Sequence, residues 1–248
     1  MSAEAALCTT PELGWRSGLG NLWSKDSHRW WGHWNWLRQS LIWLFLLNGF
    51  LTIALVSLGY RGSAALGVSM IEASFVFVVS FFSLFIGIGA IIQAQGAIID
   101  DRQRGTAAWI LSKPTSRSAF ILAKCAVLPG MLLTMVVLPG LVAVLQISLM
   151  IGQLLPITMM LMLLGWLAAA LGFYFFMTLL LGTLFLRRTL VLGLALFVLM
   201  VLTQAAQLIP HALVTHQFML PVGLVLALAG GGALCLLLAV MRFASEEF

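Results

Sequence analysis

The stretch that decides the fold is residues 125–186, which read CAVLPGMLLTMVVLPGLVAVLQISLMIGQLLPITMMLMLLGWLAAALGFYFFMTLLLGTLFL. It holds no Asp, Glu, Lys, Arg or His from end to end. A spanning helix needs about 20 apolar residues to cross a hydrocarbon core roughly 30 Å thick. The stretch is therefore long enough for two membrane spans and a short turn between them.

The rest of the chain divides in the same way. One span's worth of apolar sequence lies between Arg38 and Arg61, a second between Glu72 and Asp100, and a further pair between Arg188 and Arg242. Only 8% of the residues are charged and 62% are hydrophobic, whereas a soluble domain has roughly a quarter charged residues. The sequence predicts an all-α polytopic membrane protein, with a transmembrane domain over residues 39–248 and spans near 39–59, 71–98, 122–148, 157–185, 189–208 and 219–241.

The basic residues alternate between the predicted loops. All of them except Arg61 precede the first span, lie in the loops after the second and fourth spans, or follow the sixth. Lys and Arg near span ends are retained on the cytoplasmic side. We therefore expect a multi-pass protein of the plasma (inner) membrane with both termini in the cytoplasm, and the formal charge of +5 requires no nucleic-acid partner.

The N-terminal region has two parts. Residues 1–18 are polar and contain Gly and Pro, which predicts a flexible cytoplasmic tail. Residues 19–38 place apolar residues and tryptophans at helical spacing with charged residues between them, which predicts an amphipathic helix lying in the membrane interface. The run WWGHWNW at 30–36 could also form a platform for haem, but a single His33 is not a ligand set, and an aromatic belt is favoured.

The longest polar stretch between spans is DDRQRGTAAWILSKPTSRSAFILAK, residues 100–124. Asp100 and Asp101 are expected near the start of a short helix, where carboxylates favour the positive end of the helix dipole, and Pro114 ends it. Ser116 is expected to cap the helix that re-enters the membrane. The exposed apolar Trp109, Ile110 and Leu111 predict a docking surface, although an amphipathic hairpin resting on lipid fits the same pattern.

The spans offer no chemistry of their own. No acidic or basic side chain that could relay protons lies in residues 73–99, 125–186 or 189–210, and Glu72 is expected at the outer mouth of the second span. The chain has neither an HExxH nor a GxxxxGK[ST] motif. Cys8, Cys125 and Cys235 are scattered, and His211 and His216 have no third ligand, so no metal site is predicted. No catalytic residue and no cofactor are therefore expected in this chain.

Neutral polar groups remain inside the spans: Ser80, Ser83, Gln93, Gln95, Gln146, Ser148, Thr178, Thr183, Thr203 and Gln204. Such groups usually hold helices together, and small residues at Gly87, Gly89 and Gly165 predict close helix approach. The last outer loop, residues 203–221, is uncharged and rich in amides, His and Pro, which predicts an amphipathic cap.

The 100–124 segment resembles the loop after the second span in membrane subunits of type-2 ATP-binding-cassette transporters. The matching residues are Asp101, Gly105, Thr106, Ile110, Leu111, Ser112, Pro114, Ser116, Arg117 and Lys124. Asp101 stands where that family usually has Glu, and Ala123 stands where it usually has Gly. The strong part of the likeness covers this segment, and the six-span plan agrees over the rest.

The resemblance implies an exporter subunit that works as a dimer, with itself or a homologue, on two cytoplasmic ATPase subunits that hold ATP and Mg. It implies a coupling loop at 100–117, with ATPase contacts at Asp101, Arg102, Arg104, Gly105, Thr106, Trp109, Ile110, Leu111, Pro114 and Arg117. It implies an outer gate loop at 203–221 and a pathway between spans 2 and 5, with candidate residues Ser80, Ser83, Gln93, Thr203 and Gln204.

Other readings stay open at the level of the sequence. A haem-export-like subunit would use the Trp run, and a non-transporting assembly or immunity protein would need no ATPase. The expected cargo is amphipathic or hydrophobic, and lipid, peptide, drug and polymer all remain possible. A strongly ionic cargo is disfavoured because a charge at the bilayer midplane needs a partner.

Overall fold

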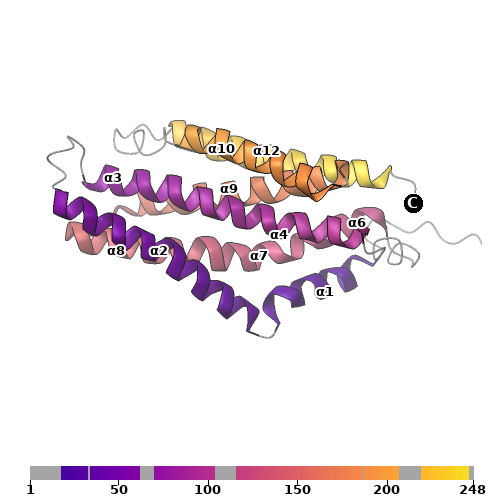
Figure 1. The fold of residues 1–248 in the computed structure, drawn as a ribbon, viewed down its shortest axis with the longest axis horizontal. Helices are drawn as coiled ribbons and strands as arrows, with labels where there is room; N and C mark the ends of the chain where they lie inside the picture. The colour runs from indigo at the N-terminus through magenta and orange to yellow at the C-terminus, as the bar shows by residue number, and fades with distance from the viewer. Residues whose placement is uncertain are drawn as a thin grey trace, which may run out of the picture.

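The computed structural model describes residues 18–32, 34–61, 70–103, 116–185, 187–206 and 219–245. Every regular element in these ranges is helical, and they contain no strand. Figure 1 shows long helices lying side by side along one direction, with the short helix α1 angled away from them at one end of the bundle. The predicted all-helical architecture is therefore confirmed.

The long helical segments follow the predicted spans closely. They are α2 (Asn35–Arg61); α3 (Met70–Phe77), η2 (Val78–Phe82) and α4 (Ser83–Gln103) as one rod; α6 (Arg117–Ala123), η3 (Lys124–Val127), α7 (Leu128–Met131), η4 (Leu132–Val137) and α8 (Leu138–Ile151) as another; α9 (Ile157–Leu184); α10 (Arg188–Ala206); and α12 (Met219–Ala244). Each end lies within five residues of its predicted position. The charge-free intervals therefore locate the helices well.

Five of these helical segments are long and apolar enough to cross a membrane. They are Asn35–Ser57, Ala73–Asp101, Arg117–Ile151, Ile157–Leu184 and Val222–Ala244. The apolar part of α10, Arg188–Gln204, is shorter. The chain is thus a multi-pass α-helical membrane protein by the length and composition of its helices.

The N-terminal helix differs from the expected single helix over 19–38. Helix α1 spans Leu19–Trp31 and ends at Gly32, whose N–H donates to the His28 carbonyl at 2.8 Å. Trp34 then adopts a φ of 59°, a left-handed conformation in which a bulky side chain is rare and which no helix continues through. This elbow starts α2 at Asn35, so residues 35–38 belong to the first long helix.

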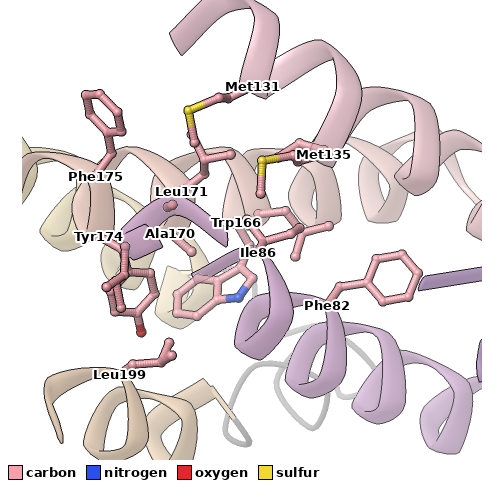
Figure 2. Close-up of a cluster of buried hydrophobic side chains, with 14 of the residues drawn as sticks. Phe82, Ile86, Met131, Met135, Trp166, Ala170, Leu171, Tyr174, Phe175 and Leu199 are labelled. Carbon is pink, nitrogen blue, oxygen red and sulfur yellow. The ribbon is translucent and has the colours of Figure 1, made fainter. Parts of the chain in front are cut away.

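The core forms where four of the long segments meet. Figure 2 shows part of this cluster, with Phe82 and Ile86 from the second segment, Met131 and Met135 from the third, Trp166 from α9 and Leu199 from α10. The indole N–H of Trp166 donates to Ser83 Oγ at 2.8 Å, so the polar atoms of both buried side chains are satisfied.

Two of the three glycines predicted to permit close approach do so. A Cβ on Gly87 would lie 2.5 Å from Leu199 Cδ1 of α10, and one on Gly89 would lie 2.4 Å from the Met135 Cε methyl. A Cβ on Gly165 would meet nothing within 4 Å, so that prediction was wrong. At Gly232 of α12 an added Cβ would lie 3.2 Å from the Phe173 Cα of α9, which shows how closely these two helices pack.

Charged residues gather at one end of the bundle. Figure 1 shows α1, α6, the final part of α4 and the C-terminal end of α12 at the same end. All basic residues of the described ranges except Arg61 lie in these elements, in η3 directly after α6, near the start of α2, or at the junction of α9 and α10. We call this the basic end.

Candidate functional site

The basic end contains a buried charge cluster centred on Lys124. Its ammonium donates to Asp101 Oδ2 at 2.7 Å and lies 3.1 Å from Asp26 Oδ2, and its side chain is only 8% exposed. The ammonium also lies 4.8 Å from the centre of the Phe120 ring. We call Lys124, Asp26 and Asp101 the charge clamp.

Local structure explains how the clamp forms. The Ser116 hydroxyl accepts from the Ala119 N–H at 3.1 Å, which confirms the predicted N-cap and starts the helix that carries Lys124. Asp101 lies in the last turn of α4. The Lys124–Asp101 pair therefore closes the base of the segment between the second and third long helices.

The third member of the clamp arrives on α1. Trp30 of α1 is buried, and its ring lies directly on Gly130: a Cβ there would be 2.1 Å from Trp30 Cδ1. Only glycine permits this approach, and it fixes α1 against α6 and η3, with which it packs. Asp26, one turn earlier on α1, is thereby brought to Lys124.

The two aspartates were expected at the start of a short separate helix, and this is wrong. Asp100 and Asp101 lie at the C-terminal end of α4, where the helix dipole disfavours a carboxylate. Nearby cations offset that cost. Lys124 pairs with Asp101, and Arg188 Nη1 lies 3.9 Å from Asp100 Oδ1.

Two further sets of contacts join α10 and α12 to the helices of the basic end. Arg188 Nε donates to Gln95 Oε1 at 3.2 Å, which ties the start of α10 to α4. Arg117 Nη1 donates to the Ala244 carbonyl at 3.2 Å, and Phe120 stacks on Phe243 with ring centres 5.4 Å apart, which ties α6 to the end of α12. The base of the 104–115 segment is thus joined to helices from the whole bundle.

Most of the predicted ATPase-contact residues fall outside the described residues: Arg104, Gly105, Thr106, Trp109, Ile110, Leu111 and Pro114. Arg102 lies in α4, with no description of its side chain. Asp101 and Arg117, at the two ends of the segment, are described and make the contacts given above.

A groove lies in the other half of the bundle, between the second long segment and α10. It has a volume of about 440 Å³ and is lined by Val76, Phe77, Ser80, Phe81, Leu84, Met200, Thr203 and Gln204. Its floor includes the π-helical turn η2, a distortion that is frequent at functional sites. The Ser80 hydroxyl in this turn is buried and has no hydrogen-bond partner among the described residues.

The groove brings together three of the five predicted pathway residues, Ser80, Thr203 and Gln204. The other two lie elsewhere. Ser83 is in the core, where it accepts the Trp166 indole bond. Gln93 lines a separate cavity near the basic end.

Two residues that line the groove, Phe77 and Phe81, belong to an aromatic ladder. Phe77, Phe81 and Phe85 recur one helical turn apart, with ring centres 5.0 and 4.5 Å apart, and Phe50 of α2 lies 5.2 Å from Phe81. Sequence reasoning did not single out this ladder, although the four-residue spacing was a visible signal.

Two other polar residues were also missed. Asp26 was read only as part of the polar face of the interfacial helix, because its partner is distant in sequence. Asn48 stands in the middle of the first span, is 5% exposed, and has both amide atoms buried without a partner in the described part of the chain. An amide at the centre of an apolar run was a signal that could have been used.

The geometry defines a class, a multi-pass helical membrane protein with a charge-locked base at one end and an apolar groove in the other half. No group of three His, Cys, Asp or Glu residues in the described ranges could hold a metal ion. No protein-family model matches the sequence, and no curated protein matches it. The function is therefore inferred from the residues and their geometry.

Proposed function

We propose that this chain is the membrane subunit of an ATP-binding-cassette exporter with six spans and both termini in the cytoplasm. A second permease subunit and two cytoplasmic ATPase subunits, which bind ATP and Mg, complete the transporter. The gathering of basic residues at one end supports this orientation, because Lys and Arg near span ends stay on the cytoplasmic side. On this view α10, the shortest apolar helix, is the fifth span.

The charge clamp is the observation that carries the proposal. Asp101 and Lys124 are the charged residues that bracket the segment resembling a coupling loop, and they bond to each other at 2.7 Å. An ion pair shielded from water is strong only when both partners are held in place, and truncating one partner is costly. A force applied to residues 104–115 would therefore reach α4, the third long helix and α1 together.

The path from the clamp to the groove is a continuous helical rod. Asp101 and Ser80 both lie on the segment from α3 to α4, and at 1.5 Å per residue they are about 30 Å apart along its axis. At Gly87 this rod packs directly against Leu199 of α10. A shift of α4 at the basic end would thus change how the second long segment packs against α10, the two elements between which the groove lies.

The groove suits an amphipathic cargo. Its wall is aromatic and aliphatic, and its polar side chains are the neutral Ser80, Thr203 and Gln204. Among the described residues none that lines it is charged, which favours a cargo without an ionic group at this level. Its volume lies within the roughly 300–1,000 Å³ of small-molecule sites, so it would accept one hydrocarbon-rich portion of a cargo with a hydroxyl or amide group.

Reconstitution with the ATPase partner tests the proposal. The subunit should co-purify with an ATP-binding-cassette ATPase and stimulate its ATP turnover in proteoliposomes. Gly105→Asp or Trp109→Asp should abolish this stimulation while membrane insertion is retained, and Lys25→Asp, on the exposed face of α1, is the matched control.

Unchanged stimulation in both loop variants would contradict the proposal, as would transport by the purified subunit without nucleotide. Absence of any ATPase partner would favour an assembly or immunity protein instead. Haem absorbance in the purified subunit would favour the haem-export reading.

A further inference from the structure

A second cavity lies beside α1, apart from the groove. It has a volume of about 180 Å³ and opens between α1, the start of α2, α4 and η3. Its polar lining consists of Asp26, Trp30, Asn35, Arg38, Gln39, Gln93 and Lys124. We call it the α1 pocket.

Four exposed tryptophans near this pocket indicate its position along the membrane normal. Trp23 and Trp31 on α1 are 41% and 40% exposed, and Trp34 and Trp36 at the elbow are 75% and 38% exposed. Indole rings favour the headgroup zone because they combine an apolar ring with an N–H donor. The pocket next to them therefore lies at the level of lipid headgroups.

Arg38 is the polar group of the pocket with unused hydrogen-bonding capacity. Within the described residues its guanidinium makes one long bond, 3.4 Å to Asn35 Oδ1, which lies at the weak end of the range. The Trp30 Nε1 donor does not add to this capacity, because it is buried against Gly130, where an added Cβ would lie 2.4 Å from it.

The charge pattern selects the kind of ligand. Lys124 is neutralised by its two carboxylates, and the Asp26 carboxylate also lines the pocket. Arg38 supplies the other cation among the described residues that line the pocket. The pocket therefore offers one cationic and one anionic site together with amide groups, and these charges balance with Asp101 included.

We infer that the α1 pocket binds the headgroup of a zwitterionic phospholipid that carries a primary ammonium. The phosphate accepts from Arg38 and the neutral donors, because guanidinium groups bind phosphate strongly. The ammonium donates to Asp26. The small volume admits a headgroup and excludes a drug-sized molecule, for which roughly 300 Å³ or more is usual. The inference requires only that the protein lies in a bilayer, and it does not depend on an ATPase partner.

The bound headgroup has a structural consequence. It touches α1, α2 and α4 at once, and it lies next to the charge clamp through Asp26 and Lys124. The lipid would therefore stabilise the position of α1 against the bundle. The composition of the inner leaflet would then influence the base of the 104–115 segment.

Native mass spectrometry of the full-length protein in detergent tests the inference. The probes are short-chain phosphatidylethanolamine, phosphatidylcholine and phosphatidylglycerol, which differ in the ammonium donors and the net charge. Phosphatidylethanolamine should bind tightest. Arg38→Gln should weaken its binding by about tenfold, because the substitution removes the charge-assisted bonds from the guanidinium to the phosphate.

Two further variants separate binding from folding. Gln93→Leu removes a pocket amide without touching the clamp and should weaken phosphatidylethanolamine several-fold. Arg187→Gln removes an exposed cation at the same end, outside the pocket, and should leave the dissociation constant unchanged. Size-exclusion profiles of all three variants should match the wild type.

Equal affinity for the three lipids would overturn the inference, and so would an unchanged dissociation constant in Arg38→Gln. Free O-phosphoethanolamine should compete only weakly because it lacks acyl chains. If it binds as tightly as the lipid, the ligand is a soluble headgroup analogue and the assignment to a membrane lipid is wrong.

Discussion

The two ends of the second long helix differ in whether their buried polar groups have partners. At the basic end, Asp101 is bonded to a buried Lys124, and Asp100 lies near Arg188. About 30 Å away along the same helix, the buried Ser80 hydroxyl in the groove has no partner among the described residues. Satisfied buried charges hold a structure rigid, whereas an unsatisfied buried group costs free energy until something binds it. The contrast indicates a mechanical anchor at one end and a ligand-ready surface near the other.

The largest effect is expected when the anchor loses its cation. Lys124→Met leaves Asp26 and Asp101 without their shared cation, and we expect it to lower the free energy of unfolding by about 3 kcal/mol. This value is at the low end for a broken buried pair because both carboxylates are partly exposed. Unfolding in mixed micelles measures the change. Adding Asp101→Asn and Asp26→Asn should restore much of the loss, and a loss that persists unchanged would contradict the clamp.

The next effect concerns the contact that brings α1 to the clamp. Gly130→Ala forces a methyl group into the Trp30 ring, and we expect a destabilisation of about 2 kcal/mol, typical of overpacking. Gly193→Ala is the matched control because a Cβ there meets nothing within 4 Å. The same unfolding assay applies. Equal stability of the two variants would show that α1 is not held through Gly130.

A pair of serines three residues apart gives effects of opposite sign. Ser83→Ala leaves the Trp166 N–H unpaired and should cost about 1–2 kcal/mol. Ser80→Ala removes a buried hydroxyl that has no partner in the described part of the chain, and it should raise stability by up to about 1 kcal/mol while weakening cargo-stimulated ATP turnover. If both substitutions destabilise the protein equally, Ser80 is an ordinary core residue and the groove is not a ligand site.

The smallest effect is expected at Arg188. Its ion contact with Asp100 is 3.9 Å long and the Arg188 side chain is 52% exposed, so solvent screens it. Arg188→Gln should change the free energy of unfolding by less than about 1 kcal/mol. A loss comparable to that of Lys124→Met would mean that the anchor extends over the whole basic end.

The helices could be predicted from the sequence, whereas the pairings between them could not. The absence of charges over 125–186 fixes two spans because an ionised group in hydrocarbon is costly. The partner of Lys124 was not predictable because Asp26 and Asp101 are far from it in sequence, and only the packing of Trp30 on Gly130 brings Asp26 near. The elbow was missed because the amphipathic pattern continues through Trp34, whose left-handed backbone ends the helix.

For the same reason, the sequence indicated only some of the polar residues that line the groove. Ser80, Thr203 and Gln204 share the groove because they lie at the same level of neighbouring helices. Ser83 and Gln93 have the same polar character in sequence, but their positions on α4 direct one to Trp166 and the other to the α1 pocket. Composition identifies polar residues within spans, and only helix packing decides which of them bind a ligand.

The central claim is that the charge clamp transmits motion from the 104–115 segment to the groove. Its most direct test is the rate at which a membrane-impermeant maleimide modifies Ser80→Cys, in a background without the native cysteines, in the complex with its ATPase. We predict that ATP turnover changes this rate several-fold with the clamp intact and has no effect when Lys124→Met and Asp101→Asn are combined. The same ATP response in both proteins would contradict the account.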